Sequence, residues 1–144
     1  MKPVLLIVDD EQDIRDMLSR HYRYLGYEVL TAENGIDALR KLASEHVNVV
    51  ISDIKMPEMD GIQLLREIRA QYPMMHTIII TGFVTQENVL TCMRVGADCC
   101  LFKPFDDLSE LDAAVQRAVE AIERWINTLH GLIEMKSKQG VPVA

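Results

Sequence analysis

The sequence contains few cysteines, and their number and spacing argue against two common uses of this residue. Three are present among 144 residues, which is an odd count, and no two are separated by the two residues typical of zinc-binding and redox motifs. We therefore expect neither a disulfide framework nor a structural zinc site, and interpret the cysteines as reduced, buried thiols. They are Cys92, Cys99 and Cys100.

Long apolar runs and an excess of basic residues are also missing. No apolar stretch approaches the roughly 20 residues needed to span a bilayer. The first residues, MKPVLLIVDDE, turn acidic after five apolar residues and lack the small-residue cleavage site of a signal peptide. The net charge is −7, whereas nucleic-acid binding requires clustered Lys and Arg. We expect a cytoplasmic protein that by itself binds neither membrane nor nucleic acid.

The sequence does contain five short apolar runs separated by polar stretches. With 49% hydrophobic and 26% charged residues, the composition is that of one compact domain. Three of the runs are nearly continuous Val, Ile or Leu, as expected for parallel strands covered on both faces. The runs are residues 3–9, 27–32, 47–53, 76–82 and 97–103.

The stretches between these runs have the apolar spacing of helices, with glycines at several junctions. Strands alternating with helices predict a doubly wound parallel α/β sheet with helices on both faces. The residues expected on the buried helix faces are Ile14, Met17, Leu18, His21 and Leu25, then Ile36, Leu39 and Leu42, then Ile62, Leu65 and Ile68, and finally Val89 and Met93.

Polar residues gather at the ends of the predicted strands. In doubly wound sheets the functional site lies at the carboxyl ends of the strands, where the strand order reverses. The first run ends in the acidic sequence DDE (9–11), the third ends at Asp53, the fourth at Thr81 and the fifth at Lys103. If these four strands are neighbours, carboxylates, a hydroxyl and an ammonium converge on one edge of the sheet.

Such a cluster of carboxylates needs a compensating positive charge. Two unit charges about 5 Å apart repel by roughly 3 kcal/mol at an effective dielectric constant of about 20. Mg²⁺, or Mn²⁺, is the cation that suits carboxylate and carbonyl oxygens and engages phosphate groups. Lys103 and Thr81 offer the charge and the hydroxyl that a transferring phosphoryl group needs, and an Asp carboxylate can be its acceptor. The residues thus predict a Mg²⁺-dependent aspartyl-phosphate site.

In combination, these motifs resemble the receiver domain of bacterial two-component response regulators. The resemblance rests on Asp9-Asp10, on Asp53 followed by MPEMDG, on Thr81-Gly82 and on Lys103-Pro104-Phe105, in this order. It implies a flavodoxin-like (βα)5 sheet with strand order 2-1-3-4-5. It also implies a phosphorylation-controlled signalling switch. We assign residues 1–122 to this domain and residues 123–144 to a helical extension and tail.

The resemblance assigns roles to the acidic residues. Asp53 would accept a phosphoryl group from a phosphohistidine on a sensor histidine kinase or a phosphotransfer protein. Asp10, Asp53 and the backbone carbonyl of Lys55 would bind Mg²⁺. Asp9 would act on the metal through a bound water molecule.

The resemblance also assigns a role to the fourth and fifth strands. Thr81 and Lys103 would contact the phosphoryl oxygens, the Lys103–Pro104 bond would be cis, and the signal would leave through the strand-four/strand-five face and the C-terminal helix. Receivers commonly carry an aromatic residue three positions before this lysine, where this chain has Cys100. We therefore expect activation to remodel residues 82–86 and the Cys100 face without an aromatic rotamer switch.

Two positions flank the route of a hydrolytic water. They lie two residues after Asp53 and two residues after Thr81, and are Lys55 and Phe83. Neither side chain offers an acid or amide to orient the water, so slow self-dephosphorylation is expected.

Each motif by itself also has an ordinary structural explanation. Asp9-Asp10 can cap the first helix, Thr81-Gly82 can form a turn, and Lys103-Pro104 can lie in a surface loop. We interpret Asp60-Gly61 structurally, as a turn and the entry to the third helix, with Glu58 in solvent.

A phosphatase with an Asp nucleophile on a related fold is the alternative from another class. It would require a second acid two residues after the nucleophile, where this chain has Lys55. A flavin-binding protein fits less well, because the turn after the first strand is acidic where a phosphate-binding loop is required. We favour a signalling domain whose chemistry is limited to its own phosphorylation and dephosphorylation.

The fifth helix is expected to begin near Asp107 and to continue toward Lys136. Its first half must pack on the sheet, but its apolar positions from Ile122 to Ile133 have no sheet left to cover them, and such a stripe usually marks an interface. A parallel or antiparallel homodimer, or a helix leading to a further output domain, is expected; the alternative is a helix that folds back or frays. The apolar series is Leu108, Leu111, Val115, Ala118, Ile122, Trp125, Leu129 and Leu132.

Overall fold

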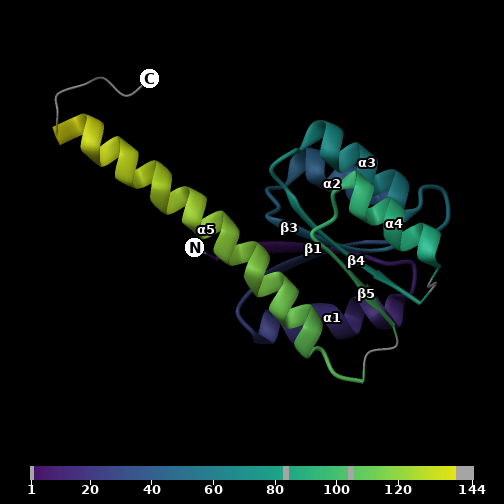
Figure 1. Cartoon of the computed structure of the whole chain (residues 1–144). Helices are drawn as coiled ribbons and strands as arrows, with labels where there is room; N and C mark the ends of the chain where they lie inside the picture. The colour runs from purple at the N-terminus through teal and green to yellow at the C-terminus, as the bar shows by residue number, and fades with distance from the viewer. Residues whose placement is uncertain (1, 83–84, 104–105, 139–144) are drawn as a thin grey trace.

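A five-stranded parallel sheet with helices on both faces forms the structure (Figure 1). The computed structural model describes residues 2–82, 85–103 and 106–138. The strand order is β2-β1-β3-β4-β5, which confirms the predicted flavodoxin-like topology. The strands are β1 (Val4–Val8), β2 (Glu28–Ala32), β3 (Val49–Asp53), β4 (His76–Thr81) and β5 (Cys99–Phe102).

In the part of the chain that the structure describes, five helices connect and follow these strands, and several begin at a side-chain cap. Asn34 caps α2 and Thr85 caps α4, while Asp60 and Gln63 form a reciprocal capping box at α3. The structural interpretation of Asp60 is thus confirmed. The helices are α1 (Gln12–Tyr24), α2 (Gly35–Ser44), α3 (Gly61–Gln71), α4 (Gln86–Val95) and α5 (Ser109–Lys138).

Four sequence predictions fall wholly or partly on residues outside the described ranges. They concern the side chain of Phe83, the remodelling of residues 82–86, the Lys103–Pro104 peptide bond and the end of the tail after Lys138. Within the described ranges, no helix combines the length and the apolar character needed to cross a membrane.

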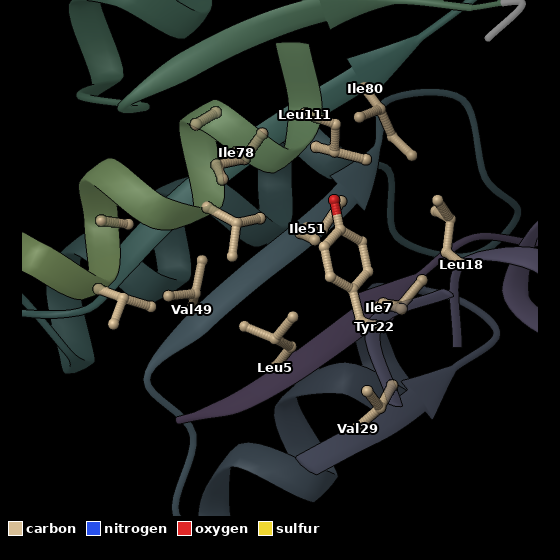
Figure 2. Close-up of a cluster of buried hydrophobic side chains, with 14 residues drawn as sticks. Leu5, Ile7, Leu18, Tyr22, Val29, Val49, Ile51, Ile78, Ile80 and Leu111 are labelled. Carbon is tan, nitrogen blue, oxygen red and sulfur yellow. The ribbon is translucent and has the colours of Figure 1, made fainter. Parts of the chain in front are cut away.

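The core is divided by the sheet into two layers. Side chains of β1 alternate, so that Leu5 and Ile7 face α1 and α5, whereas Leu6 and Val8 face α2 and α3. Tyr22 of α1 is fully buried in the first layer (Figure 2). All five strands coincide with the predicted apolar runs, because a parallel sheet covered on both faces requires continuous apolar segments.

The predicted helix faces were wrong at several positions. Met93 is 71% exposed, and its neighbour Cys92 is buried against Ile54 and Ile79 instead. Leu25, the C-cap residue of α1, is also exposed. Ile36 is also exposed.

The loop from β3 to α3 passes unusually close to the strand that precedes it. Gly61 N donates to Ile54 O at 2.8 Å, and a Cβ atom on Gly61 would lie 2.0 Å from the Asp53 carbonyl oxygen. Glu58 in the same loop has a φ angle of 67°, the left-handed conformation that side chains other than glycine rarely adopt. The loop geometry therefore depends on one glycine and includes one strained residue.

Helix α5 has two parts with different surroundings. Its first half packs on the sheet through Leu111, Val115 and Ala118, and Asp112 lies 2.8 Å from His21 Nε2 of α1. The helix begins at Ser109, two residues later than expected, because the Asp107 side chain accepts a hydrogen bond from the Ser109 amide as a cap does. Ile122, Trp125 and Ile126 still line a groove with the loop before β4, and the helix then extends away from the rest of the described chain (Figure 1).

Gly61→Ala is expected to lower the free energy of unfolding by about 2–4 kcal/mol, because the new Cβ meets backbone atoms that have no room to move. Chemical denaturation followed by circular dichroism measures this. Gly131→Ala is the matched control, since a Cβ there meets nothing within 4 Å and should leave the stability unchanged or raise it by up to about 1 kcal/mol. Equal effects of the two substitutions would contradict the close approach at Gly61.

Glu58→Gly is expected to stabilise the fold by about 0.5–1 kcal/mol, because glycine adopts the left-handed conformation without the clash of a Cβ. The substitution also removes a 3.4 Å hydrogen bond from Asn34 to the exposed Glu58 carboxylate, which is worth little. Glu58→Ala removes the same hydrogen bond but keeps the Cβ, so it should not stabilise. A gain in stability in both variants would show that the effect comes from removing the carboxylate and not from the backbone conformation.

Candidate functional site

Four strand ends meet at one edge of the sheet. Asp9 directly follows β1, Asp53 ends β3, Thr81 ends β4 and Lys103 directly follows β5. Because all strands are parallel and β1, β3, β4 and β5 are consecutive neighbours, their carboxyl ends share this edge. The structure thus brings together Asp9, Asp53 and Lys103, as the sequence predicted.

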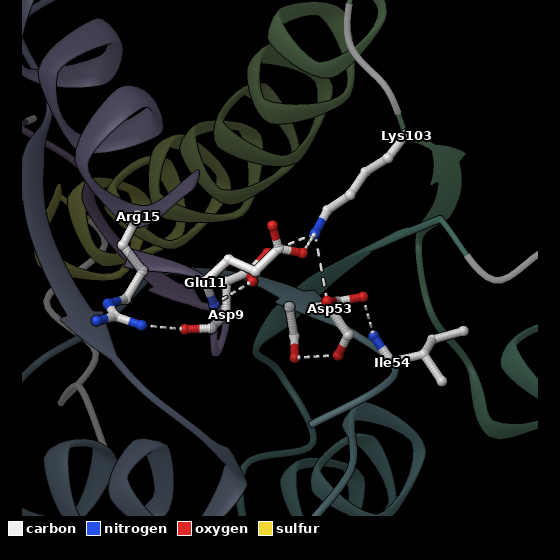
Figure 3. Close-up of polar contacts among 7 residues, drawn as sticks. Asp9, Glu11, Arg15, Asp53, Ile54 and Lys103 are labelled. Carbon is white, nitrogen blue, oxygen red and sulfur yellow. Dashed lines mark hydrogen bonds and ion pairs between the residues drawn. The ribbon is translucent and has the colours of Figure 1, made fainter. Parts of the chain in front are cut away.

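Lys103 is the central side chain of the site. Its Nζ atom lies 2.7 Å from Asp9 Oδ2 and 3.2 Å from Asp53 Oδ2 (Figure 3). It also lies 3.8 Å from Glu11 Oε1. The ammonium therefore bridges carboxylates that come from two adjacent strands, β1 and β3.

The backbone around the two buried carboxylates is fixed by further hydrogen bonds. Arg15 Nη1 donates to the Asp9 carbonyl oxygen at 2.6 Å, and Asp9 Oδ1 accepts from the Glu11 amide at 2.9 Å. Asp53 Oδ1 accepts from the Ile54 amide at 2.7 Å. These bonds leave each carboxylate with one oxygen directed to Lys103.

Burial and neighbouring charges act in opposite directions on this cluster. Burial raises the pKa of Asp53 above its ordinary value, and the Asp9 charge adds to this effect, although Lys103 partly offsets it. Burial also works against the Lys103 ammonium, yet its hydrogen bond to Asp9 and the charges of Asp9 and Asp53 leave its pKa above the ordinary value. Lys103 is therefore charged at neutral pH, and the positive charge of one lysine does not fully compensate Asp53.

The acidic residues also have the arrangement of a cation site. Asp9, Asp10, Glu11 and Asp53 each offer an oxygen, and these atoms lie within 4.8 Å of one another. Oxygen donors of this kind fit Mg²⁺ or Mn²⁺. Asp10 is exposed, whereas Asp9 is fully buried and bonded to Lys103. The position of Glu11 in this cluster was not predicted, although the run of three acids after β1 was the signal for it.

For two other predicted site residues, Thr81 and Lys55, the structure gives the position but does not test the predicted contact. The Thr81 side chain is buried at the end of β4, and its carbonyl oxygen accepts from the Lys103 amide at 2.8 Å. Lys55 is exposed in the loop after β3. The contact of Thr81 with a phosphoryl group and the metal-binding role of the Lys55 carbonyl stay predictions.

Cys100 lies on the face of β5 that is covered by α4. It packs with Cys92, Ile79 and Ile54, and burial raises the pKa of its thiol to about 11. The thiol is therefore neutral at physiological pH. All three cysteines are free, as expected, but Cys99 and Cys100 are only half-buried, which corrects the expectation of buried thiols.

Similarity to known proteins agrees with this geometry. The family model for the response regulator receiver domain matches residues 5–116. The regulatory protein AtoC of Escherichia coli is 41% identical over 128 residues, which are 88% of this chain and 28% of AtoC. The DNA-binding transcriptional regulator NtrC of the same organism is 39% identical over 116 residues, which are 81% of this chain and 24% of NtrC. The chain thus spans about a quarter of the length of these two relatives.

Solved structures show the same fold. A CheY-like receiver domain protein from Methanospirillum hungatei aligns with a TM-score of 0.80 and 31% identity, covering 86% of this chain and 99% of that one. The response regulator TrrA from Thermotoga maritima, solved in complex with Mg²⁺ and BeF, aligns with a TM-score of 0.74 and 36% identity, covering 82% and 99% of the two chains. Sequence, fold and site agree, and the chain belongs to the family of response regulator receiver domains.

Proposed function

We propose that the chain is a phosphorylation-controlled switch in which Asp53 is the phosphoacceptor. The observation that carries this proposal is the position of Lys103 Nζ, 2.7 Å from the Asp9 carboxylate and 3.2 Å from the Asp53 carboxylate. An ammonium at this point would neutralise charge on an Asp53 acyl phosphate. Membership of the receiver family supports the same role.

The proposed reaction is a transfer between two protein side chains. An Asp53 carboxylate oxygen attacks the phosphorus atom of a phosphohistidine and forms a P–O bond, the P–N bond breaks, and the leaving imidazole nitrogen takes up a proton. The Lys103 ammonium and the Thr81 hydroxyl donate hydrogen bonds to the phosphoryl oxygens. The phosphohistidine belongs to a sensor histidine kinase or a phosphotransfer protein.

The same proposal includes a divalent cation. Asp10, Asp53 and the Lys55 carbonyl would hold Mg²⁺ or Mn²⁺, with Asp9 acting through a water molecule. When bound, the cation supplies positive charge beside the phosphoryl oxygens that Lys103 alone does not provide. The close oxygen cluster of these acids supports this part of the proposal.

Loss of the phosphoryl group is proposed to be slow. The side chain two residues after Asp53 is Lys55, a cation that cannot act as a base toward a hydrolytic water while it is protonated. The matching residue after Thr81, Phe83, lies outside the described residues. A persistent phosphorylated state fits a signal that is removed by a partner protein.

The output is proposed to pass through the β4/β5 face and α5. Cys100 occupies the α4-facing side of β5 with a small thiol, so activation would shift backbone around residues 82–86 rather than rotate an aromatic ring. We divide the chain into a receiver domain, 1–122, and a helical extension and tail, 123–144. The extension would join a second copy of the chain or a further output domain.

Phosphorylation is tested by incubating the chain with acetyl phosphate and Mg²⁺ and weighing the intact protein. One adduct of about 80 Da is expected, labile to base, absent in Asp53→Asn and much reduced when the metal is chelated. Asp60→Asn is the matched control, because the Asp60 side chain serves to cap α3, asparagine caps a helix equally well, and the variant should be phosphorylated normally. An unmodified parent chain, or an adduct that survives in Asp53→Asn, would overturn the proposal.

The raised pKa of Asp53 predicts a pH-dependent effect of Asp53→Asn on stability. The native state binds the Asp53 proton more tightly than the unfolded state does, so the stability contributed by this group is present at low pH and is lost as the pH rises through the raised pKa. In chelator at pH 7, Asp53→Asn should therefore melt at a higher temperature than the parent. The difference should vanish below about pH 4.

The same melting temperatures, measured with Mg²⁺ in place of the chelator, test the metal-binding part of the proposal. Because the metal stabilises only a chain that binds it, Mg²⁺ should raise the melting temperature of the parent more than that of Asp53→Asn. A parent chain that is the more stable of the two at pH 7 in chelator would contradict the uncompensated charge.

A further inference from the structure

A basic depression lies between the C-terminal ends of α3 and α4, which are side by side on one face of the sheet (Figure 1). These helix ends lead into β4 and β5, so the depression is at the edge of the sheet where the strands begin, away from Asp53. Its volume is about 580 Å³, within the range of small-molecule sites. We call it the arginine pocket; its lining is Arg66, Arg69, Ala70, Thr91, Arg94 and Val95.

The arginine pocket concentrates positive charge in an acidic chain. The chain has 22 acidic residues against 15 Lys and Arg, yet the described lining of the pocket holds three arginines and no acid. Within the described ranges, none of these three arginines forms an ion pair with a carboxylate, whereas Arg40 on α2 pairs with Asp37 at 3.5 Å. The described acids of the chain therefore do not neutralise the three guanidinium groups.

Two of the arginines also have a structural explanation. Arg69 lies in the last turn of α3 and Arg94 in the last turn of α4, where a cation interacts favourably with the negative end of the helix dipole. Each helix end carries roughly half a negative charge, so the two ends together offset about one of the three positive charges. Arg66 lies before the last turn of α3. The pocket therefore retains about two positive charges, which matches a dianion.

Arg69 is held in place by contacts within the chain. Its Nη2 atom donates to the carbonyl oxygen of Met75, and its Cδ atom lies 3.4 Å from the position that a Cβ atom on Gly96 would take. Its Nε atom is buried and has no hydrogen-bond partner in the described part of the chain. A guanidinium that is fixed in this way loses little conformational freedom when it binds a ligand, which favours affinity.

Two acidic residues near the pocket have other partners. Asp98 shares the neighbouring groove with Arg69, but its carboxylate lies 2.7 Å from His76 Nδ1 and forms no ion pair with Arg69. Glu67 on α3 accepts a hydrogen bond from Gln71 at 2.8 Å. Neither carboxylate belongs to the lining, so the counter-charge for the arginines can come from a ligand.

The remaining lining limits the chemistry of this ligand. Thr91 Oγ1 already donates to the Glu87 carbonyl oxygen at 2.8 Å, so the polar contacts come from guanidinium groups, which bind phosphate through pairs of parallel hydrogen bonds. A phosphate ester carries about 1.5 to 2 negative charges at pH 7, more than a single carboxylate does. The pocket volume far exceeds the roughly 30 Å³ of one water molecule, so it also has room for the organic part of an ester.

We propose that the arginine pocket binds a small phosphate ester. The phosphate group lies between the guanidinium groups of Arg66, Arg69 and Arg94, and the organic part lies on Ala70 and Val95. The proposal goes beyond the phosphorylation switch, because it assigns a second, non-covalent phosphate site to the other edge of the sheet. Binding requires no divalent cation, since the arginines provide the positive charge.

Binding is tested by calorimetric titration of the full chain with phenyl phosphate in metal-free buffer. We expect a dissociation constant of about 1 mM or lower, and values about tenfold higher for two control anions. Inorganic phosphate lacks the organic part, and succinate is a dianion without phosphorus. No binding of phenyl phosphate at about 10 mM, or a control anion that binds as tightly as the ester, would overturn the proposal.

The arginines are tested by Arg66→Gln and Arg94→Gln, which each remove one charge from an exposed position. Each should raise the dissociation constant for phenyl phosphate by about tenfold without lowering the melting temperature. Arg94→Lys keeps the charge but loses the paired donors, so it should raise the constant by a smaller factor. Arg20→Gln is the matched control, because Arg20 is also exposed but lies on α1, which covers the other face of the sheet. An equal effect of Arg20→Gln and Arg66→Gln would reduce the binding to net charge and contradict the assigned site.

The location is tested by the amide NMR shifts of the full chain during the same titration. The largest changes are expected in the last two turns of α3 and the last turn of α4. Changes centred on Lys103 would place the probe at the proposed phosphorylation site and overturn the second site. Because this titration contains neither Mg²⁺ nor acetyl phosphate, its failure would leave the mass test of Asp53 phosphorylation unaffected.

Discussion

The bridge from Lys103 to Asp9 and Asp53 is the interaction on which the site depends. Two carboxylates with almost no solvent exposure stand at the ends of adjacent strands, a position that is unfavourable unless a positive charge is close. One lysine from the far side of β4 supplies that charge and leaves Asp53 only partly compensated. The fold therefore holds these three side chains in place, and the negative charge that Lys103 does not balance favours a further cation nearby.

The parallel sheet makes this arrangement possible. Each strand delivers its last residue to the same edge, and the helices that follow must turn away without covering it. At β3 this turn is so tight that Gly61 lies against the Asp53 backbone, which links the position of the Asp53 carboxylate to the start of α3. A movement of Asp53 would be transmitted to α3 without any side chain as an intermediary.

Much of the fold could be predicted from the sequence because apolar run length reports parallel strands directly. The ends of the strands could be predicted from the ends of these runs, and the positions of Asp9, Asp53 and Lys103 from the strand ends. Local spacing did not predict Tyr22, since an aromatic ring with a hydroxyl is compatible with a partly exposed face as well as with a core. Likewise, Cys92 rather than Met93 faces the core of α4, a choice of one position that depends on how the helix is rotated over β5.

The candidate site was predicted less completely than the fold. Glu11 was recognised as part of an acidic run but not as a neighbour of Lys103, because its distance depends on the rotamer of an exposed side chain. The strain at Glu58 was also invisible, since backbone angles in a loop are set by its two anchored ends. The sequence predicts which residues converge when strands determine their positions. It does not predict this when a loop conformation or a side-chain rotamer determines the position.

The unbroken continuity of α5 has a mechanical consequence. One rigid helix spans the sheet and then extends about 24 Å beyond it, so it works as a lever whose short arm is held by Leu111, Val115 and the His21–Asp112 contact. A tilt of a few degrees at the sheet displaces the tip by an ångström or more. Small rearrangements near the strand ends can thus be read at a distance from the receiver without any change in its core.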